Sequence, residues 1–135
     1  MTGVGRLHTQ AILQLLHGID GVTVYDGKVD DNPTFPYTVL HPDPGTKTRS
    51  GFNAVSDQVT TRFQTTSVGE TRDQAAWAHD KVDAALADVS ISTITGRNCW
   101  PISQDAAQPV RRDDEIKPPR FYAVAQWRLA SVPAA

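Results

Sequence analysis

The chain has 135 residues, of which 39% are hydrophobic and 21% are charged, and its net charge is −2. This length and composition predict one soluble globular domain over residues 1–135 and exclude a disordered chain. The small negative charge argues against a protein that binds nucleic acid through its overall field. We therefore expect no sequence-specific nucleic acid binding.

Three further features bear on location. No apolar run approaches the roughly 20 residues of a membrane span, so no membrane contact is expected. The N-terminal sequence MTGVGRLHTQ lacks the apolar core of a signal peptide. Cys99 is the only cysteine, which rules out an internal disulfide and is typical of a reducing, intracellular compartment.

Hydrophobic periodicity predicts two helices, at 4–19 and 71–89. In the first, apolar residues recur every three or four positions, and Gly18 indicates a stop because glycine accepts left-handed backbone just beyond a helix. In the second, TRDQ at 71–74 resembles a capping box that opens an alanine-rich helix.

Strands are expected where apolar and polar residues alternate. The clearest cases are DQVTTRFQTTSV at 57–68 and RFYAVAQWRLASV at 120–132. In the second of these, one face is expected to carry Phe121, Ala123, Ala125, Trp127 and Leu129. Shorter strands are predicted at 22–25, 37–40 and 90–100.

The elements are separated by two segments predicted to be long loops. Residues 45–54 carry two glycines and several hydroxyl side chains, which predict a loop or hairpin tip, and residues 101–119 carry four prolines without any periodicity. The resulting element order is α-β-β-β-α-β-β. We expect an α+β, two-layer domain with a mostly antiparallel sheet of about four to five strands and two helices on one face.

Four prolines surround the short strand in NPTFPYTVLHPDP. Pro33 and Pro36 precede it, and Pro42 and Pro44 follow it. Proline lacks an N–H group and is confined to the edges, ends and bulges of sheets. Our hypothesis is that these prolines cap the strand so that it cannot template open-ended pairing.

A search for chemistry finds no motif for phosphate, dinucleotide, zinc or nucleophilic catalysis, so no cofactor is expected. Cys99 is interpreted as a structural thiol. The one cluster that could hold a divalent metal is Asp30, Asp31, His41 and Asp43, which flank the short strand. The alternative interpretation of the same residues is a solvated turn followed by a strand exit.

The long loop carries a block of mixed charge, Arg111-Arg112-Asp113-Asp114-Glu115. In a symmetric ring such a block can pair head to tail with a different patch on the next subunit, and Trp100 at the root of the loop can serve as an apolar anchor. The other interpretation is a solvated charge run. The interface residues expected on these grounds are Trp100, Arg111, Arg112, Asp113, Asp114 and Glu115, together with Arg49 and Phe52 in the first loop.

The pattern of the whole chain resembles a family. It consists of an amphipathic helix, then VYDGKVDDNPTFPYTVL, the alternating strand DQVTTRFQTTSVG, the segment ETRDQAAWAHDKVDAALAD and a last strand containing WRL. This is similar to the tail terminator, or tail completion, proteins of long-tailed bacteriophages and prophages. The likeness does not extend to residues 101–119.

The resemblance implies a structural protein and not an enzyme. Such proteins form a homo-hexameric ring on the head-proximal end of the tail tube, where the ring ends tube polymerisation and docks the head-neck or stopper protein. The expected partners are therefore a copy of the same chain, the tail tube protein and the neck protein. The expected location is the virion, at the head–tail junction, and the host cytoplasm during assembly.

Three alternatives stay open. A neighbouring neck or head-completion protein belongs to the same structural class. A small metal-dependent enzyme would use Asp30, Asp31, His41 and Asp43. A cellular interaction module with the same α+β build would stay monomeric and bind a peptide or protein.

Overall fold

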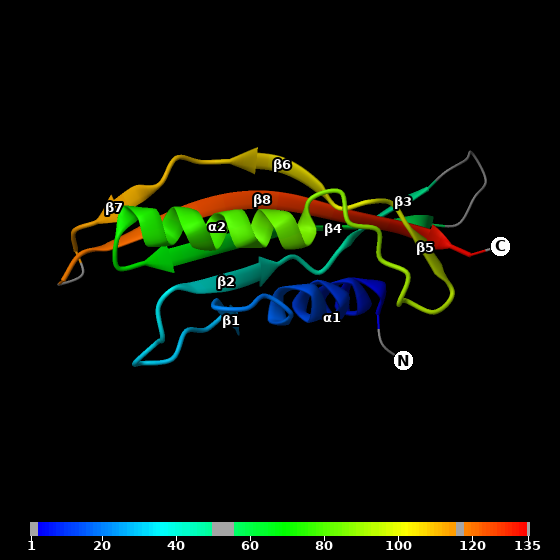
Figure 1. Cartoon of the computed structure of the whole chain (residues 1–135). Helices are drawn as coiled ribbons and strands as arrows, with labels where there is room; N and C mark the ends of the chain where they lie inside the picture. The colour runs from blue at the N-terminus through cyan, green and yellow to red at the C-terminus, as the bar shows by residue number, and fades with distance from the viewer. Residues whose placement is uncertain (1–2, 50–55, 116–117, 135) are drawn as a thin grey trace.

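The computed structural model describes residues 3–49, 56–115 and 118–134. Two helices cover one face of an eight-stranded sheet, which confirms the expected α+β, mostly antiparallel domain but with more strands than predicted (Figure 1). The elements are α1 (Val4–His17), β1 (Thr23–Asp26), β2 (Tyr37–Pro42), β3 (Thr46–Arg49), β4 (Ser56–Gly69), α2 (Arg72–Leu86), β5 (Arg97–Cys99), β6 (Ser103–Ala107), β7 (Arg111–Asp113) and β8 (Arg120–Pro133). Neither of the helices described is long and apolar enough to cross a membrane.

The two longest strands, β4 and β8, form the centre of the sheet. They pair antiparallel from Val59 opposite Ser131 to Gly69 opposite Phe121. Alternate residues on both strands are buried under the helices, as the period-two pattern predicted. Phe63 and Trp127 lie opposite each other in this register and stack in the core with ring centroids 6.4 Å apart.

The short strand with its prolines lies inside the sheet and not at its edge. β2 has β1 as a parallel neighbour on one side and β4 as an antiparallel neighbour on the other. Pro42 is the last residue of β2 and lies opposite Phe63. The hypothesis that the prolines protect an open edge of this strand is therefore wrong, because both of its sides are paired and the prolines only limit its length.

The prediction of a structureless loop is wrong over part of residues 101–119, and in residues 45–54 the hairpin interpretation fits the part that the structure describes. Residues 46–49 form β3 on β4, and residues 103–107 and 111–113 form β6 and β7 on β8. β6 and β7 pair through their backbones while their side chains are mostly exposed, so no apolar alternation marks them in the sequence. Ile102, fully buried, fixes the start of the second segment through backbone hydrogen bonds with Asp88 and Val89.

The strand predicted at 90–100 is also shorter than expected. Within residues 90–100, only residues 97–99 form a strand, β5, which pairs with β8. Ile91 and Ile94 enter the core from irregular backbone, and Gly96 adopts a φ of +80° that interrupts extended structure just before β5. The apolar residues of this segment were therefore a sign of burial and not of strand.

The helices follow their sequence signals closely, although each is slightly shorter than predicted. Thr71 is the N-cap of α2, and its hydroxyl accepts a hydrogen bond from Gln74 N at 3.1 Å, as the capping box predicts. α1 ends at Gly18 as predicted, but Gly18 has a φ of −78° and is not left-handed.

α1 approaches the backbone of the β2–β3 connection very closely at Gly5. A Cβ atom built on Gly5 would lie 2.1 Å from the carbonyl oxygen and 2.8 Å from the carbonyl carbon of Pro44. Real Cβ atoms do not come so near to backbone atoms, so only glycine fits at this crossing.

A buried polar cluster joins α1 to the two central strands. Arg97 Nε donates to Ser131 Oγ at 3.1 Å, which leaves the proton of that hydroxyl for His8 Nε2 at 2.7 Å. The other ring nitrogen of neutral His8, Nδ1, then donates to Thr61 Oγ1 at 2.9 Å. Burial, together with the positive charge of Arg97, lowers the pKa of His8 to about 4. The helix is thus held by a histidine that must stay neutral.

Gly5→Ala should lower the free energy of unfolding by about 1–3 kcal/mol, because the new methyl group must push α1 away from Pro44. Urea unfolding followed by circular dichroism measures this. The matched control is Gly3→Ala, since a Cβ at Gly3 meets no atom within 4 Å. Equal unfolding midpoints for the two variants would contradict the close approach.

The stability of the protein should fall as the pH drops below the unfolded pKa of His8. The unfolded chain takes up this proton near pH 6.5 and the folded chain only near pH 4, so stability is complete above pH 6.5 and declines between these values. The expected loss between pH 7.5 and 5.5 is roughly 1 kcal/mol. In His8→Gln this component should vanish from the urea-unfolding curves, and an unchanged pH dependence would argue against the neutral histidine.

Candidate assembly surface

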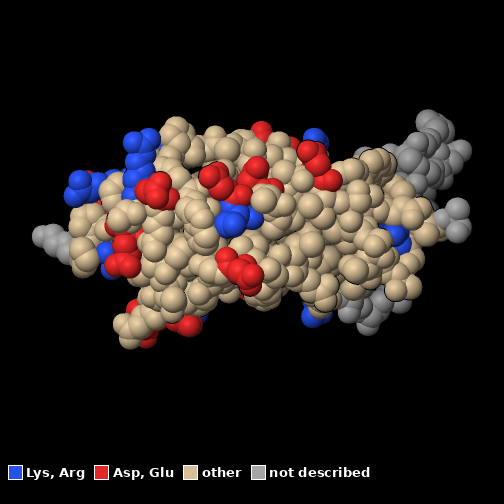
Figure 2. Space-filling view, in the orientation of Figure 1, with Lys and Arg blue, Asp and Glu red and all other residues tan. Residues whose placement is uncertain are grey.

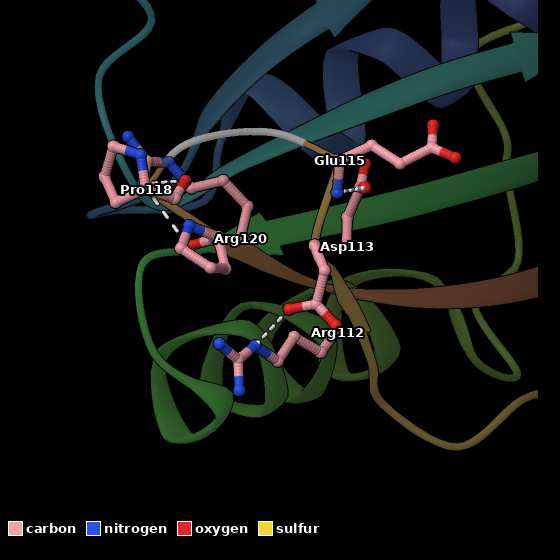
Figure 3. A network of polar contacts seen from close by, with 7 residues as sticks. Arg112, Asp113, Glu115, Pro118 and Arg120 are labelled. Atoms are coloured by element: carbon pink, nitrogen blue, oxygen red, sulfur yellow. Dashed lines mark hydrogen bonds and ion pairs between the residues drawn. The ribbon is translucent and has the colours of Figure 1, made fainter.

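The mixed-charge block lies on β7 and the turn that follows it, at one end of the long strand β8 (Figure 3). Arg112 Nε and Asp114 Oδ1 form an ion pair at 2.6 Å, and Asp113 Oδ1 accepts a hydrogen bond from Glu115 N at 3.1 Å. The block therefore satisfies part of its charge within itself. Arg111 lies opposite Tyr122 and is exposed.

This internal ion pair contributes little to folding. The side chains of Arg112 and Asp114 are 57% and 70% exposed, and an ion pair in such a setting is worth at most about 1 kcal/mol. Breaking this ion pair therefore costs little folding free energy, so both side chains are available to a partner.

An aromatic and cationic cluster stands beside the block. The guanidinium of Arg120 lies over the ring of Phe35, 4.7 Å from the ring centroid. Nη1 of Arg120 donates hydrogen bonds to the carbonyl oxygens of Pro118 and Pro119 at 2.9 and 3.3 Å (Figure 3). Tyr37 packs at 5.2 Å from Phe35, and burial raises the pKa of Tyr37 while the charge of Arg120 opposes the rise. Sequence reasoning missed this cluster because its members come from β2, from the segment before it and from β8.

The other expected interface residues are spread over the molecule. Trp100 follows β5 and is 48% exposed. Its backbone N–H donates a hydrogen bond to the carbonyl oxygen of Ala130 at 2.9 Å. Arg49 ends β3, and its side chain is outside the described part of the structure, as is the whole of Phe52. Trp100 lies beside Ala130 of β8, whereas Arg111 lies opposite Tyr122 of the same strand, so Trp100 and the charge block are separated along β8 and do not form one patch.

The four residues proposed for a metal site do not assemble into one. Asp43 Oδ1 accepts hydrogen bonds from Gly45 N at 2.9 Å and from Arg62 N at 3.2 Å, so this carboxylate shapes the turn after β2. Among the described residues, which include Asp30, Asp31, His41 and Asp43, no group of three or more His, Cys, Asp or Glu side chains could hold a metal ion. The geometry agrees with the other interpretation of these residues, a solvated turn followed by the exit from a strand.

Cys99 is half-buried at the end of β5. Burial raises the pKa of its thiol, and the charge of Arg97 only partly offsets this. A thiol with a raised pKa is a poor nucleophile, which agrees with its interpretation as a structural residue.

One pair of neighbouring charges was not predicted from the sequence. Arg62 on β4 and Arg128 on β8 lie directly opposite each other, on the sheet face that the helices do not cover. The signal was present in the sequence, because both residues fall on the polar side of an alternating strand. It could be used only with the register of the two strands, which the sequence does not reveal.

Comparison with known proteins identifies the fold. No protein-family model and no curated protein matches the chain. Among solved structures, the chain is similar to a chain from the "Virion of native gene transfer agent (GTA) particle", with a TM-score of 0.63 and 19% identity over 93% of this chain and 93% of that chain. At this identity the likeness establishes a shared fold and nothing finer.

Proposed function

We propose that the protein is a virion structural protein that forms a ring on the head-proximal end of a phage-like tail tube. The ring ends tube polymerisation and presents a surface to the head-neck proteins. Its location is the head–tail junction, and it acts by self-assembly and docking, without catalysis.

The observation that carries this proposal is the fold shared, over nearly the full length of both chains, with a protein of an assembled phage-like virion. The features of the sequence that resemble tail terminators point in the same direction. A match over the whole domain supports a shared structural task better than a match to a fragment, because the entire surface is available for comparable contacts.

The surface of the molecule agrees with a structural role. The fully buried polar groups His8, Thr61 and Ser131 hold α1 to the sheet and are closed to solvent. Some exposed charged and aromatic groups, among them Trp100, Arg111 and Arg112, lie on strands or at strand ends, where partners can reach them. Surfaces of this kind suit repeated docking between rigid subunits.

A neighbouring neck or head-completion protein is the alternative within the same structural class. The two roles differ in the first partner: a terminator binds the end of the tail tube, whereas a neck protein binds the portal or its adaptor. Pull-down of the purified chain with each partner separates them.

The wild-type chain should limit the growth of tail tubes. Tail tube protein that polymerises in its presence should give shorter tubes with a ring at one end, as seen by negative-stain electron microscopy. Light scattering over a concentration series should show a hexamer, either of the free chain or after tube is added. Tubes of unchanged length without end rings would contradict the proposal.

Reversing the exposed charges of β7 should weaken assembly more than folding. For Arg111→Glu combined with Arg112→Glu we expect a stability change below about 1 kcal/mol, because both side chains are exposed. We expect a clear loss of hexamer by light scattering under conditions in which the wild type assembles. Arg6→Glu, an exposed charge reversal on α1 and outside β7, serves as the control. A normal ring in the double variant would mean that these charges are only solvated.

A further inference from the structure

The helix-free face of the sheet carries a pair of like charges that the fold neutralises only in part. Arg62 and Arg128 are exposed and lie directly opposite each other on β4 and β8. Like charges in this position destabilise a sheet. Arg128 Nε has Asp105 Oδ1 at 3.4 Å, whereas the guanidinium of Arg62 makes no hydrogen bond or ion pair with any described residue.

These arginines line a hollow that also contains an exposed tryptophan. The hollow has a volume of about 550 Å³, and its walls are Gln58, Thr60, Arg62, Asp88, Trp100, Pro101, Ser103, Arg128 and Ala130. The other exposed tryptophan, Trp77, is in contact with Lys81, which lies 5.3 Å from its ring centroid. Trp100 has no such ring contact within the described chain. Tryptophan and arginine are the residues that most often dominate the energy of protein interfaces.

The same chain offers a matching projection elsewhere. The segment between β1 and β2 protrudes at the lower left of Figure 1, away from β5, and Figure 2 shows acidic atoms at this corner. Asp30 and Asp31 in this segment are exposed, and their carboxylates have no hydrogen bond or ion pair with the described residues. A projecting segment with two exposed carboxylates is complementary in charge to a hollow lined by two arginines.

The attraction must act at short range. Asp88 and Asp105 lie in or beside the hollow, so its net charge is small and no strong field extends from it. Its capacity to bind lies in the planar donor set of Arg62, which can hold a carboxylate through two parallel hydrogen bonds. A carboxylate placed there also relieves the repulsion between Arg62 and Arg128.

We propose that the Asp30–Asp31 turn of one copy docks into the Arg62–Arg128–Trp100 hollow of the next copy. The contact rests on the ring proposed above and specifies how neighbouring subunits meet in it. Because turn and hollow are different surfaces, the contact is head-to-tail, and its repetition closes a ring when the rotation per subunit permits.

A charge-swap experiment tests this contact. One variant carries Asp30→Arg with Asp31→Arg, a second carries Arg62→Asp with Arg128→Asp, and a third carries all four substitutions. A control reverses two exposed carboxylates outside the turn, Asp20→Arg with Asp80→Arg. Assembly is measured by light scattering over a concentration series in 0.15 M salt, with the free chain and with tail tube protein, after urea unfolding has established that each variant is folded.

Each of the first two variants should raise the concentration for half-maximal assembly by at least about tenfold, and the fourfold variant should regain most of this loss because the charges are again complementary. The control should assemble like the wild type. Unimpaired assembly of the first two variants, or no recovery in the fourfold variant, would overturn the contact and leave the ring standing. A wild-type chain that stays monomeric even on the tube would overturn the ring and the contact together.

Discussion

The antiparallel pairing of β4 with β8 is the constraint on which the remaining structure depends. Each of these strands has 14 residues, and each carries further strands on its outer side: β2 and β3 on β4, and β5, β6 and β7 on β8. Their register also decides which side chains share a face. It places Phe63 opposite Trp127 on the face that the helices cover. The same register places Arg62 opposite Arg128 on the uncovered face.

This dependence explains how a small domain can have a rigid core and an adaptable surface. The covered face holds the fully buried Trp127, whose indole N–H donates to Thr65 Oγ1 at 3.0 Å, and the His8 cluster that fastens α1. The uncovered face carries exposed charged residues such as Arg62 and Arg128. Changes to these exposed residues should leave the fold largely intact, whereas changes on the covered face alter whether the protein folds.

The parts of the fold with a strong local pattern were predictable from the sequence. Both helices and both long strands follow periodicities of 3.6 and 2, and the N-cap at Thr71 follows from its neighbours. β6 and β7 were not predictable, because SQDAA and RRD become strands only by hydrogen bonding to β8. The candidate surface divides in the same way: the charge block on β7 is visible in the sequence, but the Arg62–Arg128 pair needs the register, and the arrangement of Phe35 with Arg120 needs the tertiary fold.

The hydrogen bond between His8 and Ser131 also has a consequence during synthesis, because it spans 123 residues of sequence. α1 is made before every strand of the sheet, yet its polar anchor Ser131 and the partner strand of β4 come only with β8. Until β8 leaves the ribosome, β4 presents an unpaired side and α1 has only part of its docking surface. Proteins dominated by such distant contacts fold late and slowly. The chain is therefore unable to present its finished sheet, or any surface built on β8, to another copy before β8 has been synthesised.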